Sequence, residues 1–232
     1  MKIHGATALV TGANRGLGRH LAQQLRDRGA TVYAAARDVA SVDLDGVTPL
    51  ALDITDPASV QAAARATGGV TLLVNNAGIA RRQSLLHGDV DAIRSEFDTN
   101  VFGLLDVVRA FAPQLGSHPE SYVLNVLSVQ SWRTAATLGG YSASKSAAWS
   151  VTNGLRQELA AQGTRVAGLH VGFIDTDLAD FTTAPKADPA DVARIALDGI
   201  EADETEILAD DVSRTVRAAL AGGVGTLYPD VA

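Results

Sequence analysis

The stretch TGANRGLG, from Thr11 to Gly18, lies between an apolar run at 6–11 and a helical pattern that begins at Leu17. Its glycines let the backbone turn sharply and come close to a ligand. The N-terminus of the following helix offers unpaired N–H groups to an anion. The spacing is G-x-x-x-G-x-G instead of the common G-x-G-x-x-G, and an ordinary glycine-rich turn is the alternative. In this position the stretch predicts a β-α-β unit that binds the phosphates of a dinucleotide.

The same alternation continues along the chain. Apolar runs of strand length fall at 6–11, 31–36, 48–53, 71–76, 121–127, 164–171 and 206–210. Helical patterns fall at 17–29, 56–68, 95–115, 142–163, 188–202 and 211–221. Continuous apolar runs suit parallel strands that helices cover on both sides. The pattern has no linker or repeat, so it predicts an α/β protein: a single doubly wound, Rossmann-type domain over residues 1–232, with a parallel sheet of about seven strands and helices on both faces.

Composition narrows the classes of protein further. The chain has 232 residues, a formal net charge of −7 and no cysteine, which excludes disulfides, a thiolate nucleophile and cysteine-bound zinc. The histidines lack metal spacing, so no metal site is predicted. The acidic charge argues against nucleic acid or an anionic membrane as a partner. No apolar stretch approaches the roughly 18 residues that span a bilayer, and MKIHGATALVTG predicts a strand instead of a signal peptide. A cytoplasmic protein is expected.

A second stretch, YSASK at 141–145, places a phenol four residues ahead of an ammonium. Residues at this spacing share a face of a helix, so Lys145 can bring its charge near Tyr141. A free tyrosine has a pKa near 10, and a nearby cation favours the phenolate. The pair therefore predicts a group suited to general acid-base catalysis. The alternative is a helix face that carries both residues by coincidence.

The residues after the second predicted strand bear on which dinucleotide is bound. An acidic residue here would hold a ribose 2′-hydroxyl, whereas arginine suits a 2′-phosphate. Arg37 comes first after the strand, Arg15 lies within the glycine loop, and Asp38 follows Arg37. The two arginines favour NADP(H). If both are solvated surface residues, Asp38 would serve NAD(H) instead.

Four stretches stand in one order: TGANRGLG (11–18), NNAG (75–78), Ser128 and YSASK (141–145). This set resembles the short-chain dehydrogenase/reductase family over nearly the whole chain. The resemblance implies that Tyr141 exchanges a proton with the substrate oxygen and that Lys145 lowers the pKa of Tyr141. It also implies that Ser128 hydrogen-bonds the substrate oxygen and that Asn100 helps to hold a water in the proton relay.

The resemblance also implies a set of cofactor-binding residues. Asp53 would bind the adenine amino group, NNAG would lie against the adenine ribose, and Ile174 and Thr176 would hold the carboxamide. The whole set is Gly12, Asn14, Arg15, Gly16, Leu17, Gly18, Arg37, Asp53, Ile54, Asn75, Ala77, Gly78, Tyr141, Lys145, Ile174 and Thr176. The chain departs from the family at Val171-Gly172, where proline-glycine is usual. Valine restores an N–H and loosens φ, which weakens the assignments of Ile174 and Thr176.

The substrate end and the oligomer are also expected from this resemblance. The segment at about 176–190 corresponds to the variable lid over the substrate, and its shortness suggests an open site with a broad substrate range. Four residues are candidates to line that site: Gln130, Trp132, Phe173 and Leu178. The helices at 95–115 and 142–162 resemble the pair through which family members form dimers and tetramers, so a homodimer or homotetramer is expected.

Together these features predict an NADP(H)-dependent oxidoreductase that interconverts a carbonyl and an alcohol on a small or medium organic substrate. Hydride transfer belongs to the cofactor, while the protein orients the reactants and stabilises the developing oxyanion. Two alternatives remain open. One is a cofactor-binding sensor or scaffold with incidental turnover, and the other is an epimerase or dehydratase on the same fold.

Overall fold

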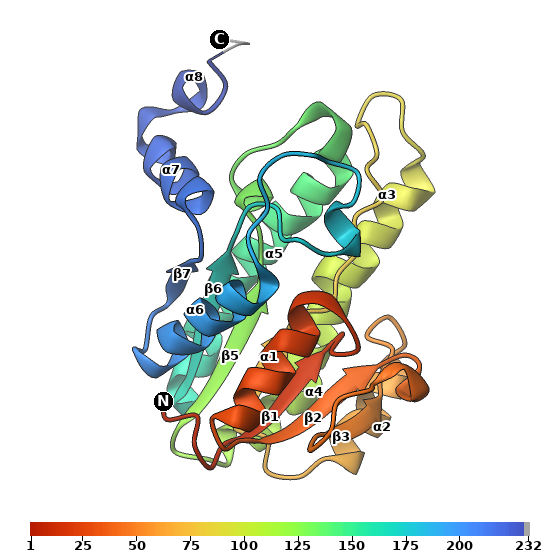
Figure 1. Cartoon of the computed structure of the whole chain (residues 1–232), viewed down its shortest axis with the longest axis vertical. Helices are drawn as coiled ribbons and strands as arrows, with labels where there is room; N and C mark the ends of the chain where they lie inside the picture. Colours follow the sequence, from red (N-terminus) through yellow and green to blue (C-terminus); the bar gives the residue numbers. More distant parts are fainter. Residues whose placement is uncertain (230–232) are drawn as a thin grey trace.

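The centre of the computed structural model, which describes residues 1–229, is a sheet of seven parallel strands (Figure 1). The strands are β1 (Thr7–Thr11), β2 (Thr31–Ala36), β3 (Thr48–Ala51), β4 (Leu72–Asn75), β5 (Ser121–Val126), β6 (Thr164–His170) and β7 (Glu206–Leu208). Their order is β3-β2-β1-β4-β5-β6-β7, which confirms the predicted doubly wound sheet. The order changes direction between β1 and β4, and a crevice is expected outside the carboxyl ends of the strands at such a point.

Helices cover both faces of this sheet. The helices of the described residues are α1 (Gly16–Asp27), α2 (Pro57–Ala66), α3 (Val90–Phe97), α4 (Leu104–Gly116), α5 (Gly139–Glu158), α6 (Pro189–Glu201), α7 (Asp211–Ala219) and α8 (Val224–Leu227). Of these, α7 and α8 extend beyond the sheet (Figure 1). Asp56 caps α2 ahead of Pro57, and Asp210 forms a capping box with Ser213 at α7, so both predicted helix starts are confirmed. Within residues 1–229, no helix is both long enough and apolar enough to cross a membrane.

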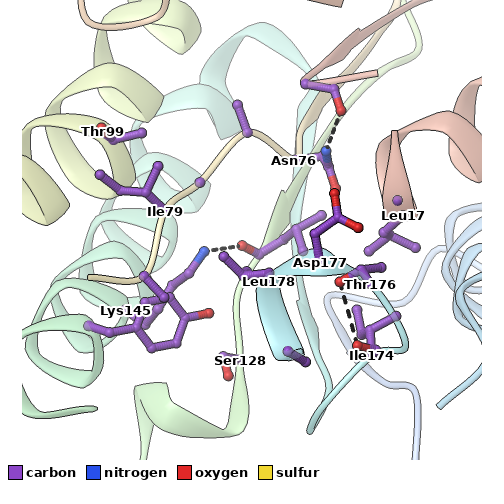
Figure 2. A pocket seen from close by; sticks show the side chains of 18 of the residues that line it. Leu17, Asn76, Ile79, Thr99, Ser128, Lys145, Ile174, Thr176, Asp177 and Leu178 are labelled. Carbon is purple, nitrogen blue, oxygen red and sulfur yellow. Dashed lines mark hydrogen bonds between the residues drawn. The ribbon is translucent and has the colours of Figure 1, made fainter. Parts of the chain in front are cut away.

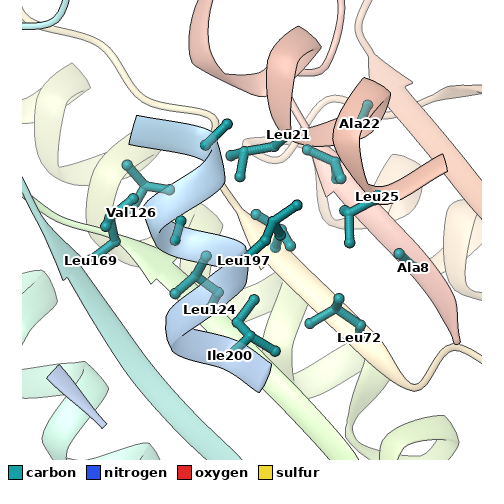
Figure 3. Close-up of a cluster of buried hydrophobic side chains, with 14 of the residues drawn as sticks. Ala8, Leu21, Ala22, Leu25, Leu72, Leu124, Val126, Leu169, Leu197 and Ile200 are labelled. Carbon is teal, nitrogen blue, oxygen red and sulfur yellow. The ribbon is translucent and has the colours of Figure 1, made fainter. Parts of the chain in front are cut away.

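Successive residues of each strand contribute to two different hydrophobic cores. On β1, Ala8 and Val10 lie in the core that α1 and α6 cover, whereas Leu9 lies in the core that α2, α4 and α5 cover. Figure 3 shows the first core, in which Leu21 of α1 and Leu197 of α6 meet over the strands. Fully burying such a side chain contributes about 1.5–3 kcal/mol. Burial on both faces explains why the strands are continuously apolar.

Two differences between the predicted and the observed elements concern the site. The third strand ends at Ala51 instead of residue 53, because the Asp53 N–H donates to Ser59 Oγ at 2.9 Å and so leaves the strand ladder. The predicted helix at 95–115 is three segments: α3, a π-helical segment Asp98–Gly103, and α4. The π-helical segment carries Asn100, whose side chain bonds outside its own helix. Segments of this kind are rare and are frequent at functional sites.

Candidate active site

A cavity of about 1330 Å³ lies at the carboxyl ends of the central strands (Figure 2). A site at this edge is expected for a doubly wound sheet. Of the predicted site residues, those that line it are Gly12, Asn14, Arg15, Gly16, Leu17, Gly18, Arg37, Asp53, Ile54, Ala77, Gly78, Ser128, Tyr141, Lys145, Ile174 and Thr176. The structure therefore brings together residues from both halves of the chain. Asn75 and Asn100 are not among the lining residues.

The glycine loop turns sharply between β1 and α1. Gly12 and Gly16 have φ of +64° and +52°, a region that L side chains rarely adopt. A Cβ on Gly18 would lie 2.1 Å from the Gly12 carbonyl oxygen, so only glycine lets α1 approach β1 this closely. Arg15 at the N-cap gives α1 no side-chain cap. The first N–H groups of α1 are therefore available to an anion.

Charged residues also line the cavity near the ends of β2 and β3: Arg37, Asp38 and Asp53. Asp53 Oδ1 accepts hydrogen bonds from Thr55 N at 2.9 Å and Thr55 Oγ1 at 2.7 Å. These bonds, with a smaller effect of Arg37, lower the pKa of Asp53, so it is ionised at neutral pH. Asp38 Oδ1 accepts from Ala40 N at 3.0 Å and caps a short 3₁₀ helix.

Arg15 has a partner that the sequence did not suggest. Its Nη1 lies 2.7 Å from Asp177 Oδ2, and the two side chains are 71% and 69% exposed. The pair joins the glycine loop to the segment predicted as a lid. A pair this exposed contributes about 0–1 kcal/mol to stability, because water screens both charges. A competing anion can therefore displace Asp177 from Arg15 at small cost.

Ser128, Tyr141 and Lys145 form one wall of the cavity. Ser128 follows β5, and its Oγ accepts a hydrogen bond from Gln130 N at 3.2 Å. Tyr141 and Lys145 lie in the first two turns of α5, and Lys145 Nζ is 5.8 Å from the Tyr141 ring centroid. Lys145 Nζ also donates to the Val126 carbonyl at 2.9 Å. The predicted sharing of a helix face thus places the ammonium beside the phenol, although not in direct contact with its ring.

The pKa of Tyr141 differs from the prediction. Burial raises it to about 12; hydrogen bonding to Ser128 opposes this rise, and the charge of Glu96 adds to it. Lys145 is expected to lower the pKa of Tyr141, but in the chain alone burial outweighs any such effect. Burial also lowers the pKa of Lys145 to about 8, so its amine still carries a proton at pH 7.

Asn75 is placed differently from the prediction. It is buried in β4, where its Nδ2 donates to Asn125 Oδ1 at 2.9 Å, and it does not line the cavity. The next residue, Asn76, does: its Nδ2 donates to the Thr11 and Gly12 carbonyls at 3.0 and 3.1 Å. Strand alternation in the sequence could have distinguished the buried Asn75 from the cavity-lining Asn76, because Asn75 lies two residues after Leu73 and so faces the same core.

Asn100 is buried behind the cavity wall. Its Oδ1 accepts from Ile79 N, and its Nδ2 donates to the Ile79 carbonyl and to Ser144 Oγ, each at 2.9 Å. These bonds tie the segment after β4 to α5. The predicted role of Asn100 in holding a relay water stays a prediction.

A sequence model of the short chain dehydrogenase family matches residues 6–187 of the chain. The matched region contains the glycine loop and the wall formed by Ser128, Tyr141 and Lys145. The chain belongs to the short-chain dehydrogenase/reductase family.

Individual family members extend over most of the chain. An uncharacterized oxidoreductase of Staphylococcus saprophyticus is 31% identical over 214 residues, covering 85% of this chain and 92% of that protein. A 3-oxoacyl-(acyl-carrier-protein) reductase of Vibrio cholerae is 31% identical over 188 residues, 77% of each chain. A short chain dehydrogenase of Burkholderia cenocepacia, solved with NADP, is 36% identical with a TM-score of 0.95 and covers 99% of this chain and 98% of its own. One from Burkholderia phymatum, solved with NAD, is 26% identical with a TM-score of 0.84 and covers 95% of each chain.

Three of the four residues predicted to line the substrate site do line the cavity. Gln130, Phe173 and Leu178 line the cavity. Trp132 does not; it is buried and stacks on His170 with ring centroids 3.8 Å apart. Several lining residues lie outside every predicted site segment: Ile79, Arg81, Thr99, Arg133, Leu138, Val212 and Val216. The last two belong to α7, and no local sequence signal connects that helix to the cavity.

No three His, Asp or Glu side chains within residues 1–229 are grouped in a way that would hold a metal ion.

Proposed function

We propose that the protein is an NADP(H)-dependent oxidoreductase that interconverts a carbonyl and an alcohol on a small or medium organic substrate. One observation carries this proposal: Ser128, Tyr141 and Lys145 line the same cavity as the glycine loop. Glycine at positions 12 and 18 lets β1, α1 and the segment after β4 pack closely, which is the arrangement that a dinucleotide-binding turn uses. A nicotinamide cofactor, when bound, would supply or accept the hydride.

The chain itself would orient the substrate and move one proton. In the reductive direction, Tyr141 Oη donates its proton to the carbonyl oxygen as that oxygen gains negative charge. A pKa of about 12 keeps Tyr141 protonated at neutral pH, which is the form that reduction needs. Ser128 Oγ donates a hydrogen bond to the same oxygen. Lys145 supplies positive charge beside the phenol and stabilises the phenolate that remains.

The preference for NADP(H) rests on Arg37 and Arg15. Both line the cavity, and a guanidinium binds a phosphate through two hydrogen bonds. Asp38, the competing ligand for a ribose hydroxyl, already uses Oδ1 to cap Ala40 N. The Burkholderia cenocepacia relative that was solved with NADP is 36% identical to this chain. NAD(H) is the alternative.

We also propose the arrangement of the whole protein. Residues 1–232 would act as a single catalytic domain in the cytoplasm, with 176–190 as the lid over the substrate. Thr176, Asp177, Leu178 and Phe181 of that segment line the cavity. The exposed Phe102, which precedes α4, supports association through α4 and α5. Light scattering of the purified protein would distinguish a monomer from a homodimer or homotetramer.

Calorimetric titration with NADPH and, separately, NADH tests the cofactor assignment, and a panel of aldehydes and ketones tests the reaction. We expect tighter binding of NADPH and NADPH-dependent reduction of at least one carbonyl. Tighter binding of NADH would assign the ribose to Asp38. Cofactor binding without turnover of any compound in the panel would favour the sensor or scaffold. Conversion of a compound without net oxidation of NADPH would favour an epimerase or dehydratase. Binding of neither cofactor would contradict the proposal.

A further inference from the structure

Glu96 is a buried acid with an unusual environment. Among residues 1–229 it is the only acidic side chain that is fully buried, at 0% exposure. Its Oε1 accepts a hydrogen bond from Arg81 N at 2.5 Å. Its Oε2 is buried without a hydrogen-bond partner in the described part of the chain. Leaving a buried carboxylate oxygen unpaired is costly, so its place in the fold needs a reason.

Oε2 lies against the start of α5, the helix that carries Tyr141 and Lys145. A Cβ on Gly140 would be 2.4 Å from Oε2, so glycine at this position lets the carboxylate approach the helix backbone. Leu138, at the N-cap of α5, provides no side-chain cap, and the first turn contains no acid. The N-terminus of a helix carries partial positive charge, which a nearby carboxylate stabilises. Burial raises the pKa of Glu96, while hydrogen bonding to the backbone of the loop after β4 and the charge of Arg81 oppose that rise. When ionised, Glu96 of α3 supplies the negative charge that α5 lacks.

Glu96 and Asn100 hold the same loop at two points. Glu96 accepts from the Arg81 amide, and Asn100 bonds both backbone groups of Ile79. Asn100 also donates to Ser144 of α5. The loop after β4 and the start of α5 are therefore joined through these two side chains. Ile79 and Arg81 of the loop, and Tyr141 of α5, line the cavity.

We propose that Glu96 is a positioning residue for Tyr141: its carboxyl group joins the loop after β4 to the first turn of α5. This inference rests on the proposed function, in which Tyr141 transfers the proton. The charged and titratable groups that face Glu96 are Arg81 from the loop and Tyr141 from α5; Lys145, also on α5, faces Tyr141. The charge of Glu96 raises the pKa of Tyr141 and so favours the protonated, proton-donating form.

Three substitutions separate the two parts of this role. Glu96→Gln keeps an acceptor for the Arg81 amide and removes the charge, whereas Glu96→Ala removes both. Asp91→Asn is the control, because Asp91 lies on the same helix and its side chain is 84% exposed. Hydrogen exchange at the Arg81 amide reports whether its hydrogen bond to Glu96 is intact. The ¹³Cζ resonance of Tyr141, assigned by its loss in Tyr141→Phe, reports the pKa of Tyr141 and therefore the effect of the charge of Glu96. Neither measurement needs cofactor or turnover.

Glu96→Ala should speed exchange at the Arg81 amide at least about tenfold, and Glu96→Gln should not. Glu96→Gln should move the titration of Tyr141 to lower pH by roughly half a unit, and Asp91→Asn should leave it in place. An unchanged titration in Glu96→Gln overturns the proposal, as does unchanged exchange in Glu96→Ala. If Glu96→Ala does not fold, the Glu96→Gln titration still decides. Absence of turnover in the unaltered protein would contradict the proposed function but would leave both measurements interpretable.

Discussion

Two ends of the cavity differ in construction. The phosphate end, named after the role proposed for it, is the glycine loop at 12–18, and the catalytic end, also named after its proposed role, is the wall formed by Ser128, Tyr141 and Lys145. At the phosphate end the wall is largely backbone, with Gly12 and Gly16 at positive φ, and the ion pair of Arg15 and Asp177 is about 70% exposed on both sides. At the catalytic end the functional groups belong to buried or half-buried side chains, with Tyr141 half-buried. Ser128 and Lys145 are each only 6% exposed.

The difference determines which kind of change each end tolerates. Water screens the charges at the phosphate end, so losing one of its ion pairs costs little, but the shape of the backbone leaves no space for an added methyl group. At the catalytic end little water screens the charges, so burial moves the pKa values of both Tyr141 and Lys145. An added side chain at the phosphate end should therefore impair cofactor binding. Replacement of a functional group at the catalytic end should impair turnover.

The largest effect is expected from Tyr141→Phe, which removes only the proton-transferring hydroxyl. Under the proposed function, kcat for carbonyl reduction should fall about a hundred- to ten-thousandfold, while calorimetry finds the same affinity for NADPH. Tyr33→Phe on β2 is the control, since Tyr33 is not among the residues that line the cavity. Retention of most of the activity by Tyr141→Phe would show that the catalytic assignment is wrong.

Gly18→Ala tests the steric half of the comparison. The added Cβ would lie 2.1 Å from the Gly12 carbonyl oxygen, so the loop must shift. The free energy of unfolding should fall by about 1–3 kcal/mol, and the Kd for NADPH should rise at least about tenfold. Gly154→Ala is a matched control within a helix, because nothing lies within 4 Å of its added Cβ; it should stabilise by about 0.5–1 kcal/mol. Equal effects of the two substitutions would contradict the close approach of α1 and β1.

The buried lysine predicts a dependence of stability on pH. The pKa of Lys145 is about 8 in the folded chain, against 10.5 for a free lysine. Between these values the unfolded chain binds more protons, so the free energy of unfolding should rise with pH from about 8 to 10, by about 1–3 kcal/mol. Above about 10 the slope reverses, because burial raises the pKa of both Tyr122 and Tyr141 and the folded chain then binds more protons. Chemical denaturation at several pH values should show no such rise in Lys145→Met.

Arg37→Ala tests the proposed 2′-phosphate contact at the exposed end. The Kd for NADPH should rise about tenfold, because a charge-assisted contact with phosphate is lost, and that for NADH should hardly change. Calorimetry of both cofactors measures the difference. Arg65→Ala is the control, since Arg65 is exposed and is not among the cavity residues. Equal weakening of NADPH and NADH would argue against the contact.

The smallest effect is expected from Asp177→Asn, which releases Arg15 from its exposed partner. NADPH should bind about twofold more tightly because Arg15 no longer exchanges partners, and the free energy of unfolding should change by less than about 1 kcal/mol. Asp175→Asn provides a matched comparison, because Asp175 is also an exposed carboxylate in an ion pair, with Lys186. A large loss of stability in Asp177→Asn would mean that the two ends of the cavity are less different than their exposures indicate.

Local patterns in the sequence predicted much of this protein. The alternation of apolar runs and helical patterns predicted the parallel sheet. A strand pattern and a helix pattern are each visible in the apolar residues of a segment of about ten residues. The glycines at 12, 16 and 18 indicated the backbone turn, and the spacing of Tyr141 and Lys145 placed both on α5. The helical patterns at 56–68 and 211–221 predicted α2 and α7, whose starts the side chains of Asp56 and Asp210 cap. Each of these features is determined within one or two turns of chain.

The tertiary structure alone decided the features that depend on distant contacts. It placed Asn75 against Asn125, Trp132 on His170, and Val216 of α7 at the cavity. The pKa values of the site residues also depend on distant contacts, because desolvation changes them. The same tyrosine has a pKa near 10 in water and about 12 here, because that value depends on which segments from the rest of the chain exclude water from it.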